Sequence, residues 1–456
     1  MARLPRRQRF QGTIRPGGPD WLYLPVEVPA GVGELAVRYG YDRAPGNALD
    51  IGVFDQRGTG PAGFRGWSGG ARDRFRIGPS GATPGYLPGR VGEGTWQVVL
   101  GPYTVAPQGL GWEVEVTLDG PPSGPAFVPD PAPERASGRG RAWYRGDLHT
   151  HTVHSDGERT PAELAAQARA AGLDFLASTE HNTTSANLGW GGHAGPDLLV
   201  VDGQEVTTRD GHWLALGLDD GGVVDWRYRA GDGGLERALA GLRGRGGLAV
   251  AAHPFCPFPG CAWRFGYRGL DAVEVWNGPW TPDDEAALGR WDRLLRAGRF
   301  LPAVAGSDAH GPEDRVGRPH TVVLADGLNR PALLAAVAAG RCWLAESAAV
   351  DLRLEAAGAG ASAGAGGRLE ATSDMAVTVR LAVRGAAGCL ARLCTQTGPV
   401  LEIRLDGDPA EVEWTTTPAA TAWARAEVRR PPAAGTGPGA MVALTNPVFL
   451  SGRPRA

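Results

Sequence analysis

The sequence predicts an α/β protein flanked on both sides by all-β regions, and three observations carry this prediction. Residues 1–120 consist of short β segments that are separated by Gly, Pro and Asp. Strand and helix patterns then alternate through residues 142–347, as is typical of a parallel α/β barrel or a doubly wound sheet. The pattern returns to β segments over residues 348–456, so a smaller C-terminal β domain is expected there.

The first β region has the alternation that a sandwich requires. In "WLYLPVEV", "ELAVRYGY" and "GWEVEVTL" apolar and polar residues alternate, as strands with one buried face do. We therefore expect an N-terminal β-sandwich over residues 1–120. A stretch dense in Pro and Gly follows, and residues 121–141 are predicted to be a linker.

The central region carries explicit helix signals. "TPAELAAQARAAG" begins with Thr160 as N-cap and Pro161 at the first helical position, and Glu163 completes a capping box. Further helices are expected in "GLERALAGLRGRG", "PDDEAALGRWDRLLRAG" and "NRPALLAAVAAG". The strands between them, such as "LDFLAST" and "LAVAAH", are short and apolar, as buried strands of a parallel sheet are.

Composition excludes several classes of protein. The 456-residue chain has a formal net charge of −3, so no general basic field favours nucleic acid or an anionic membrane. All 46 basic residues are arginine, which excludes Schiff-base and P-loop mechanisms that need lysine.

The expected location is the cytoplasm, with no attachment to a membrane. The basic start is followed by no apolar signal-type segment, and no apolar run long enough to span a membrane occurs. The five cysteines are an odd number without the spacing of a secreted framework. Cys256 and Cys261 are expected to be loop thiols, because one C-x4-C pair is too little for a closed zinc site.

Side chains of the kinds that bind metals fall at the ends of successive predicted strands. The carboxyl ends of parallel strands converge on one mouth of an α/β barrel, so these side chains are expected to meet. Imidazoles and carboxylates together form a mixed set that suits Zn²⁺, Mn²⁺ or Fe²⁺ better than Ca²⁺ or Mg²⁺. His212 begins a strand, directly after the turn that carries Glu205. The ligands predicted from this pattern are His149, His151, His181, Glu205, His212, His253, Asp308 and His310.

The motifs that contain these residues resemble those of a known family. They are "DLHTHTVHSDG", "STEHN", "GQEVTT", "GHWLALGL", "AHP" and "GSDAH". Through them the sequence resembles the polymerase and histidinol phosphatase (PHP) metallohydrolases, and "LDFLASTEHNTTS" and "AVEVWNGPW" are most similar to the CehA/McbA type. The resemblance covers roughly residues 142–346. It implies a distorted (β/α)7 barrel with two or three divalent transition metals at its mouth.

The resemblance also divides the ligands among three metals. It implies that one metal is held by His149, His151, Glu205 and Asp308. It implies that Glu205 bridges to a second metal, which is also held by His212 and His253. It implies a third metal held by Asp156, His181 and His310.

Charge favours a small anionic substrate. Two or three dications exceed the charge of the three carboxylates, and a hydroxide that bridges the metals is a ready nucleophile near pH 7. The leading hypothesis is therefore metal-dependent hydrolysis of a phosphoester. The predicted catalytic residues are Glu205, His212, Asp308 and Arg318, the last as a clamp for phosphate or carboxylate or, alternatively, a surface residue.

Two alternatives stay open. The CehA/McbA resemblance includes a carbaryl-type hydrolase, so hydrolysis of a carbamate, carboxylic ester or amide could use the same metals. A protein of another class would use its β domains to bind carbohydrate or a partner, with the barrel as a relic. Substrate choice is expected to depend on loops 183–197, 219–234 and 256–269.

Three histidines are left outside the metal sets. His154 lies two residues before Asp156 and is expected to be a solvated loop residue, with a contact to substrate as the alternative. His193 lies in a Gly-rich loop, and His320 is expected to pack at the start of "TVVLAD". Asn277, which ends "AVEVWN", is a candidate for a polar contact in the pocket.

Overall fold

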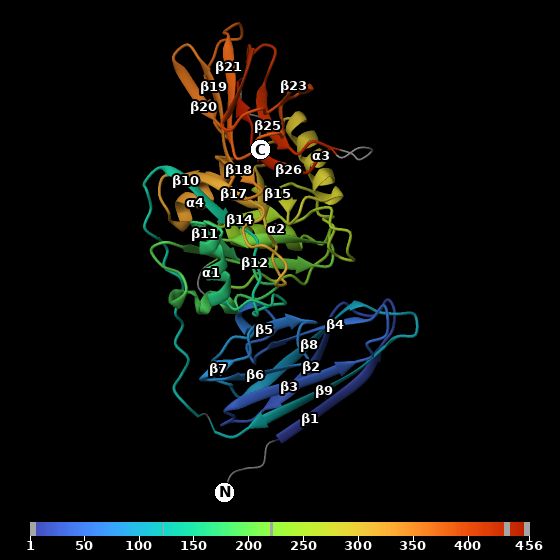
Figure 1. The fold of residues 1–456 in the computed structure, drawn as a ribbon. Coiled ribbons are helices and arrows are strands. Elements are labelled where there is room, and N and C mark those ends of the chain that lie inside the picture. The colour runs from blue at the N-terminus through green and yellow to red at the C-terminus, as the bar shows by residue number, and fades with distance from the viewer. Residues whose placement is uncertain (1–5, 122, 219–221, 433–437, 451–456) are drawn as a thin grey trace.

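The computed structural model describes residues 6–121, 123–218, 222–432 and 438–450. It is a mixed α/β protein, with four sheets and four α-helices among these residues. Figure 1 shows the N-terminal sheets at one end, the C-terminal sheets at the other, and the helices with their strands between them.

The N-terminal region contains two antiparallel sheets that share one core. Alternate residues of β2 are buried (Leu24, Val26 and Val28), which is the pattern that predicted these strands. Large side chains such as Trp96 and Tyr86 fill the space between the sheets. The first sheet has the order β1 (Arg6–Ile14), β9 (Leu110–Asp119), β3 (Glu34–Tyr41), β6 (Arg74–Gly78) and β7 (Gly81–Ala82). The second has the order β2 (Leu22–Val28), β8 (Gly94–Thr104), β4 (Ala48–Phe54) and β5 (Phe64–Gly69).

A long mixed sheet crosses the middle of the molecule. It begins with parallel and antiparallel strands in the order β16 (Ala303–Gly306), β15 (Ala272–Asn277), β14 (Leu248–Ala251), β13 (Gly211–Leu216), β12 (Leu199–Thr208), β11 (Phe175–Ser178) and β10 (Ala142–Asp147). It continues through β17 (His320–Ala325) and β18 (Cys342–Ala345). The pairs β10–β11, β11–β12, β14–β15 and β15–β16 are parallel.

The predicted succession of parallel strands fails at β13 and β17, which run antiparallel to their neighbours. Only Arg209 and Asp210 separate β12 from β13, and a parallel crossover needs about a dozen residues. The (β/α)7 barrel is not confirmed, since β16 ends the ladder of the described strands. It approaches β17 through the Thr321 hydroxyl, which accepts from the Ala305 N–H at 2.9 Å.

Helices occupy the four segments that the sequence predicts. The capping box of α1 is confirmed: Glu163 N–H donates to the Thr160 hydroxyl at 3.3 Å, and the Glu163 carboxylate accepts from Thr160 N–H at 2.8 Å. The four helices are α1 (Pro161–Ala170), α2 (Gly234–Arg243), α3 (Pro282–Arg296) and α4 (Arg330–Ala338). Short 3₁₀ helices cover Pro61–Gly63, Ser185–Leu188 and Trp190–Gly192.

The C-terminal region extends the long sheet and adds a second one. Asn446 joins it to the centre, because its side chain accepts from Ala303 N–H at 2.8 Å and donates to the Cys342 carbonyl at 3.0 Å. The long sheet continues through β26 (Met441–Thr445), β25 (Trp423–Arg429), β22 (Leu390–Thr395) and β23 (Gly398–Arg404), with β27 (Val448–Phe449) beside β25. The second sheet has the order β20 (Ala361–Gly364), β19 (Asp351–Gly358), β21 (Val377–Arg384) and β24 (Ala410–Thr416).

The N-terminal sandwich packs directly on the central region. Trp226 contacts Trp67 and Trp21, with ring centroids 4.8 and 6.3 Å apart. The Ser185 hydroxyl accepts from the Gly85 N–H at 3.0 Å. The sandwich therefore forms part of the wall beside the strand ends.

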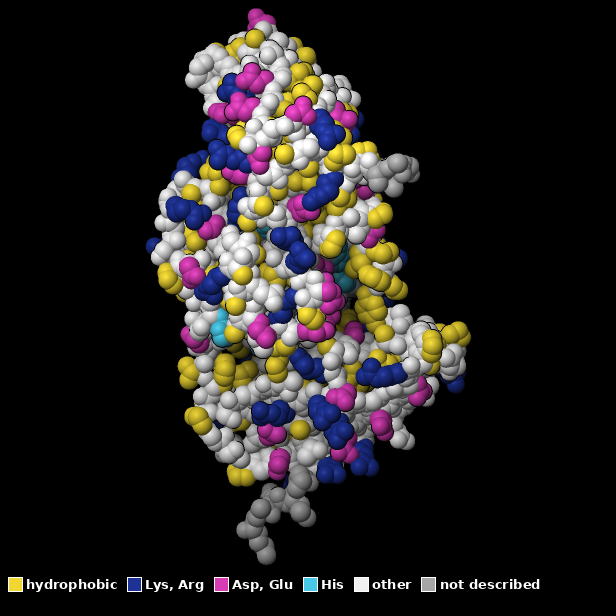
Figure 2. All heavy atoms as spheres, viewed as in Figure 1, with side chains coloured by type: hydrophobic (Ala, Val, Ile, Leu, Met, Phe, Trp, Pro, Cys, Tyr) yellow, Lys and Arg dark blue, Asp and Glu magenta, His cyan; other side chains and the backbone are white. Residues whose placement is uncertain are grey.

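The surface carries no large charge of one sign on the face seen in Figure 2, where basic and acidic side chains are interspersed. This agrees with the net charge of −3. None of the helices in the described ranges has the length and apolar character needed to cross a membrane.

Candidate metal centre

The nine predicted ligands lie in or directly after six strands of the long sheet. His149 and His151 follow β10, Asp156 lies in the loop after them, and His181 follows β11. His253 follows β14, and Asp308 with His310 follows β16. Glu205 does not follow its strand as predicted: it lies within β12, which runs on to Thr208 and pairs Glu205 with Leu214 of β13. The hairpin thereby brings Glu205 and His212 to the same place.

The first group of ligand atoms surrounds one point at the end of β10. His149 Nε2 lies 3.3 Å from a Glu205 oxygen and 3.2 Å from an Asp308 oxygen. His151 Nε2 lies 3.3 and 3.0 Å from the same two oxygens. Ligands at about 2.1 Å from a tetrahedral ion lie about 3.4 Å apart, so the spacing suits one metal ion.

Glu205 also reaches the second group. Its Oε1 lies 2.9 Å from His212 Nδ1 and 2.9 Å from His253 Nε2. Its Oε2, which belongs to the first group, lies 2.9 Å from His181 Nδ1. One carboxylate therefore touches both groups, in the arrangement that the resemblance implies for a bridging ligand.

The third group lies on the far side of His151. Asp156 Oδ1 is 3.3 Å from His310 Nε2 and 3.5 Å from His181 Nε2. The His151 ring lies against both of these rings, with centroids 4.2 and 4.4 Å apart. In the first group, and in the third group together with His151, one ligand atom per residue lies within 4.8 Å of all the others. The same holds for His212 and His253 with Cys261, and for Glu205 and His212 with His181.

Several buried atoms of these groups have no hydrogen-bond partner among the described residues. Buried polar atoms are nearly always hydrogen-bonded, because an unpaired one costs about 1–3 kcal/mol. Lone pairs that converge without donors are the pattern that a bound cation satisfies, so the residues fit a metal. The unpartnered atoms are His149 Nε2, His151 Nε2, Glu205 Oε2, His212 Nε2 and Asp308 Oδ1.

Other side chains fix the orientation of the ligand rings, and the sequence analysis missed most of them. Buried Glu274 of β15 contacts His149 Nδ1 at 3.1 Å and accepts from the His253 N–H at 2.8 Å. Asn277, the predicted polar contact, donates to Asp308 at 3.2 Å and to Glu274 at 3.0 Å. One feature of the sequence could have indicated Glu274: it is the single acid inside the apolar strand "AVEVWN".

Three of the other rings have similar partners. Thr207 lies 2.7 Å from His181 Nδ1, and Ser155 lies 3.3 Å from His151 Nδ1. The backbone carbonyl of Asp308 lies 2.8 Å from His310 Nδ1. Such contacts hold a metal-binding imidazole in one tautomer and orientation.

The carboxylates give the cluster a strongly negative field. Burial lowers the pKa of His181, but Glu205 and Asp156 outweigh it and raise that pKa to about 10. Burial also lowers the pKa of His310, but the nearby carboxylates of Asp156 and Asp308 outweigh this effect and raise the pKa to about 9. The field of the carboxylates that raises the pKa of both rings also attracts cations.

The backbone at the centre is locally unusual. His253, Asp308 and neighbouring Asn182 have φ values of 24°, 50° and 52°, in the left-handed region that side-chain-bearing residues seldom adopt. Gly306 must lack a side chain, because a Cβ there would lie 2.4 Å from the Cβ of His149. This close approach lets the end of β16 bring Asp308 against the first group.

Arg318, the predicted clamp, is not brought to the histidines. It is exposed and lines a neighbouring cavity of about 460 Å³ together with Arg315. The histidines line a different cavity of about 780 Å³, which shares only a few wall residues, such as Ser307, with the first. Arg318 is close to Asp308 in the sequence, but this closeness could not show that the two residues line different cavities.

Two expectations about the surrounding loops are wrong. His154 is not solvated: it is half-buried and contacts the Ser185 hydroxyl at 2.8 Å, because the sandwich covers this loop. Cys256 and Cys261 are not free thiols but form a disulfide, so the odd cysteine count no longer supports a reducing compartment. The packing of His320 at the start of β17 is confirmed. In the predicted substrate loop 219–234, residues 219–221 lie outside the described residues.

Comparison with known proteins supports the family that the motifs indicate. Residues 296–342 match a family model described as PHP-associated. This match supports the PHP superfamily. An alignment over 154 residues, which covers 29% of this chain and 81% of the other protein, shows 29% identity to an uncharacterized protein of Methanocaldococcus jannaschii. The CehA/McbA type is not confirmed.

Similar solved structures were also found. One is a two-domain protein from Bacteroides vulgatus with a predicted PHP-like metal-dependent phosphoesterase, at 16% identity and a TM-score of 0.38, covering 67% of this chain and 94% of that one. Another is an amidohydrolase from Chromobacterium violaceum with bound sulfate and no metal, at 23% identity and a TM-score of 0.30, covering 38% and 89%.

Proposed function

We propose that the protein is a metal-dependent hydrolase and that the nine clustered residues hold two or three divalent transition metals. The observation that carries this proposal is the convergence of buried, unpartnered ligand atoms from His149, His151, Glu205, His212 and Asp308. A relic of a metal site would be expected to have filled or lost some of these positions. Zn²⁺, Mn²⁺ and Fe²⁺ suit the mixed nitrogen and oxygen ligands.

When bound, such metals lower the pKa of water toward about 7 and polarise the bond to be cleaved. The protein's own residues prepare the site for this chemistry. Glu274 fixes His149, and Thr207 fixes His181, so the ligand rings need no reorganisation. Asn277 donates to Asp308 and holds that carboxylate in place.

A small phosphoester is the substrate class that the charge favours. Two or three dications carry a charge of +4 to +6, whereas the coordinating carboxylates Asp156, Glu205 and Asp308 supply −3. Glu274 adds one further negative charge at His149. With Glu274 included, two dications are balanced by the four carboxylates, whereas three dications leave a net charge of +2. In the three-metal state the site therefore attracts an anionic substrate and stabilises the charge that develops on phosphate oxygens.

A second candidate is hydrolysis of a carbamate, carboxylic ester or amide, the chemistry that the resemblance to the CehA/McbA type implies. The specific observation in its favour is the apolar loop beside His253. Phe255 and Phe258 line the larger cavity, and Phe258 is 73% exposed. Such a wall suits an uncharged apolar substrate or leaving group.

Metal analysis tests the hydrolase proposal first. We expect the purified chain to retain at least one equivalent of Zn, Mn or Fe, and the Asp308→Asn variant to lose metal and turnover together. The matched control is His193→Ala, because His193 lies edge-on to Trp190 and belongs to no ligand group of the described residues. Less than one equivalent of metal in the wild-type protein would favour a binding protein instead.

A substrate panel then separates the two chemistries. We expect the metal-loaded protein to hydrolyse p-nitrophenyl phosphate or its diester analogue faster than p-nitrophenyl acetate or a carbamate. Turnover of acyl substrates alone would refute the phosphoesterase proposal and leave the second candidate. Arg318→Met is expected to keep wild-type turnover, because Arg318 lines the neighbouring cavity.

A further inference from the structure

The turn between β12 and β13 buries an arginine whose side chain has no hydrogen-bond partner among the described residues. Arg209 is 8% exposed, and its Nε, Nη1 and Nη2 make no hydrogen bond to any described residue. A guanidinium carries five N–H donors, and leaving a charged group unpaired in the interior is costly. Its isolation therefore calls for an explanation, and a ligand that supplies acceptors is one.

Aromatic rings enclose the guanidinium. Its central carbon lies 5.0 Å from the ring centroid of Trp21 and 4.9 Å from that of Tyr103. Cation–π contacts of this kind stabilise the charge but satisfy none of the N–H donors. Gly101 of β8 makes the space, because a Cβ there would lie 3.2 Å from Arg209 Nη2 and 2.7 Å from the Trp21 ring.

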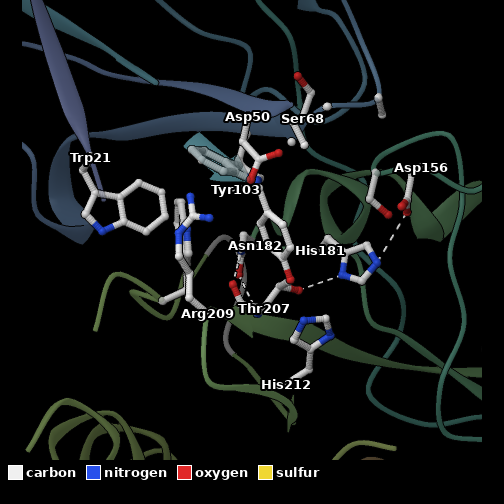
Figure 3. A pocket seen from close by; sticks show the side chains of 17 residues that line it. Trp21, Asp50, Ser68, Tyr103, Asp156, His181, Asn182, Thr207, Arg209 and His212 are labelled. Atoms are coloured by element: carbon white, nitrogen blue, oxygen red, sulfur yellow. Dashed lines mark hydrogen bonds and ion pairs between the residues drawn. The ribbon is translucent and has the colours of Figure 1, made fainter. Parts of the chain in front are cut away.

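This arginine lines a cavity that ends at the candidate metal centre. The cavity has a volume of about 280 Å³ and lies between the N-terminal sandwich and the central region. Figure 3 shows Trp21 and Arg209 on one side and His181 with Asp156 on the other. His181 and Asp156 also line the larger cavity, so the two cavities meet at the metal ligands.

We propose that this cavity is a subsite for a planar ligand bearing a carboxylate or phosphate, and that Arg209 binds this anionic group. The planar fork of a guanidinium matches both groups with paired hydrogen bonds. Trp21 and Trp67 of the sandwich supply flat apolar walls for the body of the ligand. That this ligand is the substrate rests on the proposed function, whereas its binding does not.

Two neighbours shape the subsite further. Asp50 lines the same cavity, and no ion pair or hydrogen bond of the described residues joins it to Arg209. Its carboxylate disfavours a second anionic group at this end of the ligand. Trp21 is half-buried and its ring lies over the guanidinium, so an anion that binds Arg209 changes the surroundings of this ring. Binding is therefore expected to change tryptophan fluorescence.

The test uses the full, metal-loaded chain with benzoate, phenylphosphonate and uncharged benzyl alcohol as probes. Calorimetry and tryptophan fluorescence measure binding. We expect Arg209→Met, which keeps the aliphatic stem between the rings, to weaken both anions about 10-fold to 100-fold and to leave benzyl alcohol unchanged. Arg209→Lys should have an affinity for both anions between those of the wild type and Arg209→Met. Asp50→Asn should bind both anions at least as tightly as the wild type. Binding of one anion alone identifies carboxylate or phosphate as the group that Arg209 recognises.

Arg227 provides the matched control. It lies in the same interface, with its central guanidinium carbon 4.4 Å from the ring centroid of Phe54. Unlike Arg209, it donates hydrogen bonds to Asp225, Tyr23 and the Thr59 carbonyl. Arg227→Met should leave probe affinity unchanged. Equal loss in both variants, or wild-type affinity in Arg209→Met, would overturn the subsite.

The outcome separates the subsite from the hydrolase. If Asp308→Asn abolishes anion binding and Arg209→Met does not, the anion binds at the metal centre and the subsite proposal fails. If anion binding depends on Arg209 but no substrate is turned over and no metal is retained, the subsite stands and the proposed function fails.

Discussion

Replacement of Glu274 by Gln tests whether the ligand rings are held by their neighbours. The wild-type carboxylate contacts His149 Nδ1 at 3.1 Å, accepts from His253 N–H at 2.8 Å and accepts from Asn277 at 3.0 Å. Loss of one such partner of a metal-binding histidine costs about 10-fold to 100-fold in metal affinity, or about 1.4–2.8 kcal/mol. Because Glu274 supports two ligand residues, we expect Glu274→Gln to reach the upper part of that range.

Chelator competition at fixed pH measures this change in metal affinity. Asp284→Asn is the matched control, since Asp284 is also buried but accepts from the Asn277 and Thr281 N–H groups instead of a ligand ring. We expect it to alter stability without a comparable loss of metal. Wild-type metal affinity in Glu274→Gln, or an equal loss in Asp284→Asn, would refute the reasoning.

Three predictions concern stability and are measured by urea denaturation. Thr160→Ala removes the N-cap of α1 and should cost about 1 kcal/mol, whereas Thr160→Ser should cost far less. Asn446→Ala leaves buried groups of Ala303 and Cys342 unpaired and should cost about 3 kcal/mol; a change near zero would contradict its role as a joint. Burial raises the pKa of Glu427, but Arg425 and Arg429 outweigh it and hold the pKa at about 2, below the usual value of 4.5 for a glutamate. Since the folded pKa is depressed, stability of roughly 3 kcal/mol is present above pH 4.5 and is lost as the pH falls toward 2. Glu427→Gln should weaken this dependence of stability on pH, and an unchanged dependence would contradict the role assigned to Glu427.

Much of the local structure followed from the sequence because its causes are local. The capping box at Thr160 and Glu163 fixes where α1 begins, and alternating burial in β2 follows from its apolar pattern. The predicted metal ligands fall into groups of neighbouring atoms because strand order and strand ends bring them to one edge. Their role as ligands remains a proposal that metal analysis tests.

The misses share a physical cause, which is dependence on residues distant in sequence. Strand β12 continues through Glu205 because β13 supplies its hydrogen bonds, and an apolar pattern alone does not show where such pairing stops. His154 is half-buried because the sandwich covers its loop. Cys256 and Cys261 form a disulfide because the loop folds back on itself.

The sequence by itself determined which residues are candidates for metal binding, since the identity and spacing of histidines and acids around short strands are properties of the chain. Only the tertiary structure decided how these residues are supported and what lies beside them. Glu274 reaches His149 from β15, and Arg209 meets Trp21 across the interface with the sandwich. Arg318 is turned toward another cavity. Such contacts depend on packing between segments far apart in the chain, which no local pattern of residues specifies.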